Sequence, residues 1–142
     1  MTEMVSAAIE IAASPEHVWA VLSDLTSYPQ WHPVFTEASG QLTAGNRISL
    51  TSTRQETGRS MTAKVKVLTA EPATELRWVS SVLGFMTSER SFTLSRTSGG
   101  TLLVQTGTYR GYFARFPPKT ISRIQASFEA INEAIKQQAE AP

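Results

Sequence analysis

Residues 14–33 read SPEHVWAVLSDLTSYPQWHP, and this stretch decides the fold. It predicts one capped helix followed directly by a short second helix. Ser14 is a favourable N-cap, and Pro15 at the first helical position sacrifices no hydrogen bond. The second helix is expected over 25–31, with Asp24 as its cap and Pro33 as its stop.

Alternating apolar and polar residues predict strands on both sides of this helical stretch. One strand is expected before it, over residues 4–12. Six are expected after it, over residues 34–42, 46–54, 60–69, 74–80, 87–96 and 101–110. The last two flank Ser98-Gly99-Gly100, a sequence typical of a hairpin turn.

From the Pro117-Pro118 pair onward the apolar period becomes helical. Apolar residues recur at spacings of three and four and form one narrow stripe: Ile121, Ile124, Phe128, Ile131 and Ile135. We expect the tail, residues 137–142, to fray. Two helices near the start, a sheet and one long helix at the end predict an α+β fold. The sheet would wrap around the last helix, in the order β-α-α-β6-α, as one domain over residues 1–142.

Composition excludes several classes of function. The formal net charge is +1 and the charges are interspersed, which argues against nucleic-acid binding and against anionic membranes. Cysteine is absent, which excludes a thiol nucleophile and a cysteine-type zinc site. No signal peptide and no stretch of about 18 apolar residues is found, so we expect a cytoplasmic protein without stable membrane insertion.

Several motifs carry a family resemblance. The first helix opens with Ser14-Pro-Glu-x-Val-Trp, and Leu25-Thr-Ser-Tyr-Pro-Gln-Trp-His-Pro forms the second. The later strands contain Glu75-Leu-Arg-Trp, Phe92-Thr-Leu, Gly100-Thr-x-Leu-Val-Gln and Tyr109-Arg-Gly. In this order they resemble the START-like (SRPBCC) superfamily, and more narrowly its polyketide cyclase/dehydrase and lipid-transport group.

The resemblance implies a helix-grip fold, in which a curved antiparallel sheet closes around the C-terminal helix and leaves an apolar cavity. It also implies binding of a hydrophobic small molecule, but it does not imply catalysis. Members of the group often carry a histidine before the Phe-x-Leu strand and a glutamate before the aromatic-x-Gly. The matching positions here are Arg90 and Gly107, and an alignment shifted by one residue would bring in Glu89 instead. Glycines such as Gly107 are also typical of a bulge or a bend in a curling sheet.

Arg90 shares its alternation face with Phe92 and should point inward or lie at the cavity mouth. A buried guanidinium needs an anion. The candidates are a ligand carboxylate or one of Glu56, Glu75 and Glu89. The alternative is an arginine at a strand end that pairs with a structural glutamate and extends to water.

Histidine is scarce, with only His17 and His32 in the chain. His32 is interpreted as a polar contact to a ligand or a general base, or alternatively as a loop histidine bonded to backbone. No metal-binding motif and no cofactor motif is found.

The predicted ligand contacts, each of which could instead be ordinary core, are His32, Met61, Leu76, Trp78, Arg90, Phe92, Tyr109 and Phe128. The apolar segments 83–86 and 112–116 are interpreted either as gates of the cavity or as the contact surface of a homodimer.

The favoured function is therefore binding of a hydrophobic small molecule, lipid-like or polyketide-like, in a cavity between the sheet and the C-terminal helix. One alternative is a polyketide cyclase/dehydrase-type enzyme acting in the same cavity. The other is a protein-interaction module. Few acid or base groups fall on inward faces, and this favours binding over catalysis.

Overall fold

The computed structural model describes residues 2–54, 56–82, 86–111 and 115–142. Seven strands form one antiparallel sheet in the order β1-β7-β6-β5-β4-β3-β2. The strands are β1 (Thr2–Ile11), β2 (Phe35–Ser39), β3 (Arg47–Thr53), β4 (Ser60–Glu71), β5 (Glu75–Val82), β6 (Met86–Thr97) and β7 (Gly100–Gly111). The helices are α1 (Pro15–Ser23), the 3₁₀ turn η1 (Leu25–Ser27), α2 (Tyr28–Trp31) and α3 (Pro118–Glu140).

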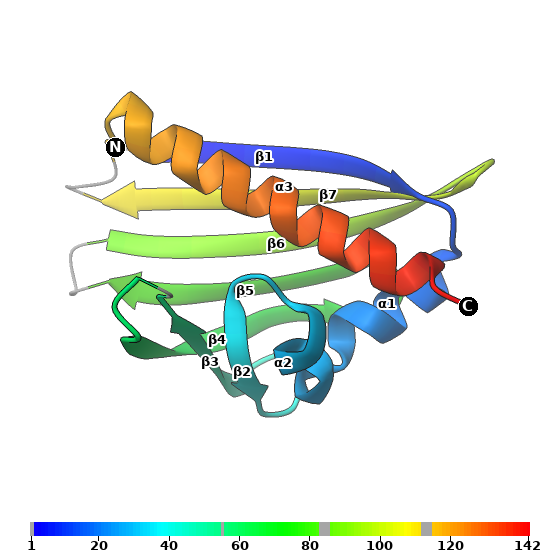
Figure 1. The fold of residues 1–142 in the computed structure, drawn as a ribbon, viewed down its shortest axis with the longest axis horizontal. Coiled ribbons are helices and arrows are strands. Elements are labelled where there is room, and N and C mark those ends of the chain that lie inside the picture. Colours follow the sequence, from blue (N-terminus) through cyan, green and yellow to red (C-terminus); the bar gives the residue numbers. More distant parts are fainter. Residues whose placement is uncertain (1, 55, 83–85, 112–114) are drawn as a thin grey trace.

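The predicted α+β helix-grip arrangement is confirmed. Figure 1 shows α3 running diagonally across one face of the sheet, over β1 and β7, towards α1. We call the face that α3 covers the inner face. The segment of α1 and α2 lies beside the β2 side of the same face (Figure 1). None of the helices in the described ranges is both long and apolar enough to span a bilayer.

Two predicted boundaries are wrong. The strand expected over 34–42 is shorter, because Gly40 adopts a positive φ of 118° and turns the chain out of the ladder. The expected fraying after residue 136 does not occur, and α3 continues to Glu140. The Glu140 carboxylate holds this last turn, because it accepts a hydrogen bond from the Ala12 backbone N–H at 2.8 Å and pairs with Lys136.

Of the two predicted N-caps of the N-terminal helices, one forms a capping hydrogen bond and the other does not. The Ser14 side chain accepts a hydrogen bond from the His17 backbone N–H at 3.2 Å, so the predicted N-cap is confirmed. The second helix splits into η1 and α2. Asp24 makes no capping bond to the backbone there, because its carboxylate accepts the Thr26 hydroxyl at 2.9 Å instead.

A pair of buried amides joins α3 to the sheet. Gln105 on β7 and Asn132 on α3 are 0% and 2% exposed. The Gln105 amide donates to the Asn132 side chain at 2.8 Å and to the Phe128 carbonyl at 3.2 Å. The Asn132 amide donates to the Ala7 carbonyl of β1 at 3.1 Å. These bonds fix the position of α3 along the sheet, and apolar periodicity gave no sign of them.

We expect Asn132→Ala to lower the free energy of unfolding by about 2 kcal/mol, because the Ala7 carbonyl and part of the Gln105 amide would be left buried without partners. Urea titration followed by circular dichroism measures the change. The exposed neighbour Glu133 provides the control, and Glu133→Ala should have little effect. Equal, small effects of both substitutions would show that the amide pair does not hold the helix.

Candidate functional site

Three rows of side chains cross the inner face over β5, β6, β7 and β1. Directly opposed residues share a face of a sheet, so the strand register defines each row. The deepest row is Leu76, Phe92, Gln105 and Ala7; the middle row is Trp78, Arg90, Gly107 and Val5; the third row is Ser80, Ser88, Tyr109 and Glu3. The inner face thus changes from packed core, through a row that contains Arg90, to a row of polar groups that includes Glu3.

A cavity of about 140 Å³ opens on this face, and we call it the inner cavity. Its walls come from β2 to β6. They are formed by Phe35, Leu50, Ser52, Met61, Ala63, Val65, Trp78, Ser80, Ser88 and Arg90. The inner cavity therefore lies over the strands that α3 leaves uncovered, and the described α3 residues do not line it directly.

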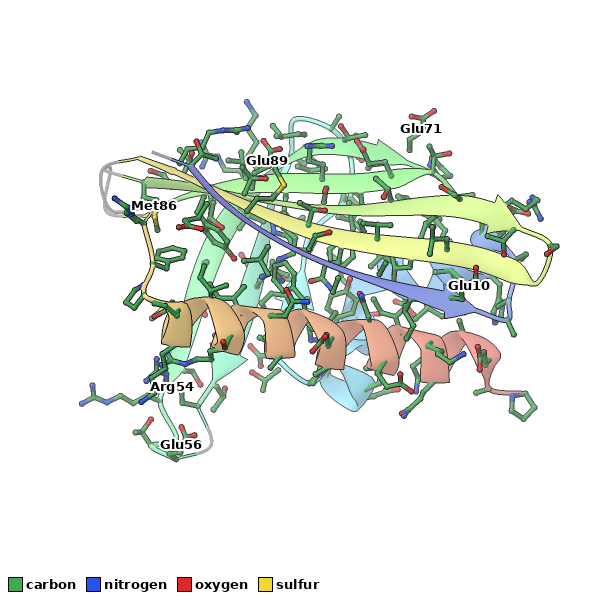
Figure 2. The ribbon with its side chains drawn as sticks, turned by 90° about the horizontal axis from the view of Figure 1, so that it is seen from above. Glu10, Arg54, Glu56, Glu71, Met86 and Glu89 are labelled. Carbon is green, nitrogen blue, oxygen red and sulfur yellow. The ribbon has the colours of Figure 1, made fainter. Side chains whose placement is uncertain are left out.

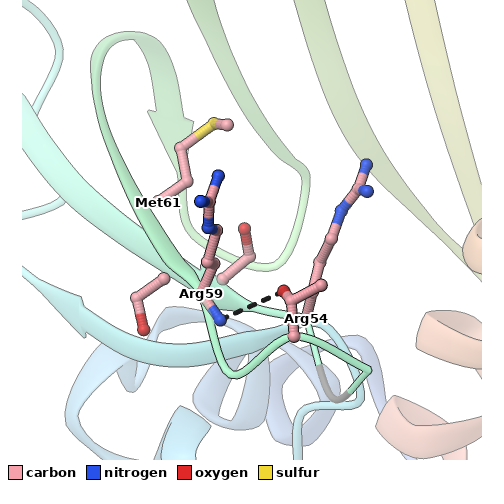
Figure 3. Close-up of a pocket in the computed structure, with 6 residues that line it drawn as sticks. Arg54, Arg59 and Met61 are labelled. Carbon is pink, nitrogen blue, oxygen red and sulfur yellow. Dashed lines mark hydrogen bonds between the residues drawn. The ribbon is translucent and has the colours of Figure 1, made fainter.

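A second hollow of about 500 Å³, which we call the outer hollow, lies at the β3–β4 turn. It is lined by Ser52, Arg54, Thr57, Arg59, Ser60 and Met61. Figure 3 shows the Arg54 and Arg59 side chains extending in the same direction beside Met61. Because Ser52 and Met61 line both spaces, the outer hollow adjoins the inner cavity. The Met61 side chain at this junction is 73% exposed although it is apolar.

Arg90 is the charged group of the inner cavity. Its guanidinium carbon lies 4.6 Å from the centre of the Phe128 ring, a cation–π contact. Burial lowers the pKa of the Arg90 guanidinium, and the nearby Tyr109 and Tyr28 hydroxyls act in the opposite direction. Arginine nevertheless stays protonated at neutral pH. Among the ion pairs of the described residues, none involves Arg90.

The glutamates expected as partners of Arg90 lie elsewhere. Glu75 and Glu89 both bind Arg77, at 3.1 and 2.6 Å. Arg77 precedes Trp78 on β5, and Glu89 precedes Arg90 on β6. Because successive side chains of a strand point to opposite faces, Arg77 and Glu89 lie on the outer face. Glu56 is exposed in the β3–β4 turn, at the end of the molecule where α3 begins (Figure 2).

Arg90 and Gly107, the two positions expected from the resemblance to depart from the family pattern, are direct partners across β6 and β7. The ladders on both sides of Gly107 are continuous, so it marks no bulge, which was one of its two expected roles. It serves close packing instead. A Cβ at this position would lie 2.7 Å from the Phe128 ring and 3.0 Å from the Tyr109 hydroxyl.

We expect Gly107→Ala to lower the free energy of unfolding by about 1–3 kcal/mol, because the added methyl group overpacks the contact with Phe128. Thermal unfolding and urea titration measure the effect. Gly99 is a suitable control, because a Cβ there meets no neighbouring atom. A neutral or stabilising Gly107→Ala would show that α3 can move away without cost.

His32 lies outside the lining of the inner cavity. Its Nδ1 accepts hydrogen bonds from the backbone N–H groups of Val34 and Phe35, at 3.1 and 3.0 Å. The ring is stacked on Tyr28 and on Phe35, with centroid distances of 4.9 and 4.7 Å. Its pKa is lowered from 6.5 to about 3, first by burial and then by the positive charge of Arg90. His32 is therefore neutral at physiological pH, with Nδ1 already occupied.

The lowered pKa of His32 predicts a pH-dependent stability. Between about pH 6.5 and 3 the unfolded chain binds a proton at this residue and the folded chain does not. The free energy of unfolding is therefore unaffected by this residue above about pH 6.5 and falls as the pH is lowered below it, by up to about 1.4 kcal/mol per pH unit. Urea titrations from pH 7 to 4.5 measure it. In His32→Gln this component of the slope should vanish, and parallel pH profiles for the two proteins would contradict the assignment.

Apart from His32, the predicted contact residues fall into three groups in the structure. Met61, Trp78 and Arg90 line the inner cavity. Phe128 and Tyr109 do not line the inner cavity but lie next to the Arg90 guanidinium. Leu76 and Phe92 lie one row deeper, at 0% and 2% exposure in the core.

Sequence reasoning missed Ser80 and Ser88, which line the inner cavity and face each other across β5 and β6. Their alternation parity with Trp78 and Arg90 was the available signal. Of the two predicted gate segments, residues 83–85 and 112–114 lie outside the described residues. Phe116 is half-buried and packs against Tyr109 with ring centres 5.2 Å apart, so it is not a free apolar surface. Within the described ranges, no three metal-ligating side chains gather at one point.

Comparisons with known proteins agree with this geometry. The sequence profile of the family described as polyketide cyclase / dehydrase and lipid transport matches residues 2–140. A search of curated protein sequences finds no match.

Solved structures of similar shape include a START superfamily protein from Mycobacterium smegmatis, at 20% identity and a TM-score of 0.76, covering 96% of this chain and 97% of that one. A protein from Chromobacterium violaceum is 15% identical with a TM-score of 0.80, covering 98% and 99%. The di-domain ARO/CYC StfQ of the steffimycin biosynthetic pathway is 13% identical with a TM-score of 0.79, covering 99% of this chain and 52% of StfQ. At these identities the similarity shows the fold alone.

Proposed function

This chain belongs to the polyketide cyclase/dehydrase and lipid transport family, and on that premise we propose that it binds an apolar small molecule in the inner cavity. The observation that carries the proposal is the composition of the cavity wall. Phe35, Leu50, Val65 and Trp78 supply apolar surface. Three of the four polar lining residues lie together on β5 and β6, and the fourth, Ser52, lies on β3. Ligand pockets typically combine an apolar wall with a small number of polar groups in this way.

The sizes of the two spaces limit the ligand. At about 140 Å³ the inner cavity is smaller than the roughly 300–1,000 Å³ of most ligand pockets. It accepts one small ring system or a short chain, and a longer ligand would extend past Met61 into the outer hollow of about 500 Å³. Burial of each CH₂ group contributes about 0.8 kcal/mol. A ligand of roughly ten carbons could thus reach micromolar affinity after the costs of association.

The wall chemistry favours binding over acid–base catalysis. Among the described residues that line the inner cavity, the titratable side chain is Arg90, which does not exchange protons near neutral pH. His32 is fixed by the backbone and has a pKa of about 3, too far below neutrality for an efficient general base. A cyclase or dehydrase activity would therefore have to act through positioning of the substrate alone.

The experiment that tests the proposal compares two insertions of the same side chain. Ser80 faces the inner cavity, and its exposed neighbour Ser81 faces away. We expect Ser80→Phe to fill the cavity and to weaken binding of the neutral dye N-phenyl-1-naphthylamine at least tenfold, while Ser81→Phe leaves it unchanged. Fluorescence titration measures both, and native mass spectrometry with organic extraction identifies any ligand that co-purifies with the wild-type protein.

Two results would contradict the proposal. One is equal dye affinity in the wild type and in Ser80→Phe, which would place binding elsewhere. The other is an apo mass for the freshly purified protein together with no dye binding, which would favour an interaction role for the same face.

A further inference from the structure

We propose that the ligand carries a carboxylate at the end that enters the inner cavity, and that Arg90 binds this carboxylate. The inference rests on the proposed function and deepens it, because it names the chemical class of the ligand. Such a ligand would be an aryl or alkyl carboxylic acid with its charged end innermost and its apolar body towards Met61.

The first argument is charge balance on the inner face. Arg90 is half-buried. A guanidinium that is even partly withdrawn from water is costly unless an anion compensates it. The Phe128 ring face at 4.6 Å compensates Arg90 only in part. Among the three rows of the inner face, the one carboxylate is Glu3, which lies in the next row, opposite Tyr109. The ion pairs of the described residues do not include one between Glu3 and Arg90.

The second argument is the arrangement of donors around the empty space. Ser88 precedes Arg90 by two residues on β6 and therefore shares its face. Ser80 is the cross-strand partner of Ser88, and both serines line the same cavity as Arg90. A planar guanidinium binds a carboxylate through two parallel hydrogen bonds, and neighbouring hydroxyls can donate to its remaining lone pairs. A compact carboxylate matches this set of donors in a cavity of about 140 Å³.

The third argument is the charge of the approach. Arg54 and Arg59 line the outer hollow beside the inner cavity, and its other lining residues are uncharged. Glu56 is the exposed carboxylate of the same turn and does not line the hollow. Both arginines are exposed, so they affect the rate of association of an anion more than its final affinity. A ligand that approaches the inner cavity from the side of the outer hollow thus passes two positive charges.

The test uses two compounds of nearly the same shape, 2-naphthoate and 2-naphthamide, titrated calorimetrically at pH 7. We expect the wild-type protein to bind the carboxylate at least tenfold more tightly than the amide. Arg90→Met should abolish this preference while retaining affinity for the amide and for N-phenyl-1-naphthylamine. Arg96→Met is the matched control, because Arg96 lies on the same strand, is 63% exposed and pairs with Glu16; this variant should keep the preference.

Different failures have different meanings. Dye binding without preference for the carboxylate, or a preference that persists in Arg90→Met, would overturn the assignment of Arg90 and leave the proposed function intact. Failure of dye, carboxylate and amide to bind the wild type would overturn both. If Arg90→Met does not fold, Arg90→Lys replaces it, and we expect this variant to show a reduced preference because lysine keeps the charge but lacks the two-pronged geometry. An unreduced preference in Arg90→Lys would count against the bidentate arrangement and overturn the inference as stated.

Discussion

The hydrogen bonds of Asn132 set the geometry on which the rest of the inner face depends. Asn132 binds the Gln105 side chain on β7 and the Ala7 carbonyl on β1, so one residue of α3 is tied to two neighbouring strands. Buried amides tolerate little displacement, because any shift leaves a polar atom without a partner. The helix is therefore fixed along its own axis. Phe128, one turn earlier on α3, is consequently held against Gly107.

That placement determines the environment of Arg90. Gly107 removes the side chain that would keep Phe128 away from the sheet, and the Phe128 ring then offers its face to the Arg90 guanidinium. A cation and a glycine thus lie directly opposite each other on β6 and β7. The cation is stabilised by an aromatic ring, not by a carboxylate, and it remains able to bind an anion from outside. Arg90 cannot serve as an acid or base at neutral pH, and this is one reason why we propose recognition and not proton transfer.

The fold alone does not distinguish a ligand-binding protein from an enzyme that transfers protons. The family and the structural neighbours establish the helix-grip architecture, and that architecture supports more than one activity. The distinction comes from individual side chains on the inner face. His32 illustrates it, because its backbone hydrogen bonds and burial make it a structural ring next to the site.

The sequence by itself determined the element order, the cap at Ser14, the inward stripe of α3 and the inward direction of Arg90, because these follow from short-range periodicity and from local hydrogen bonding. It could not determine which carboxylates reach Arg90, since Glu75 and Glu89 are held by Arg77 on the other face. It also could not show that Gln105 meets Asn132, or that Gly107 admits Phe128. These contacts join residues 21 to 27 positions apart, and only the packing of α3 on the sheet brings them together.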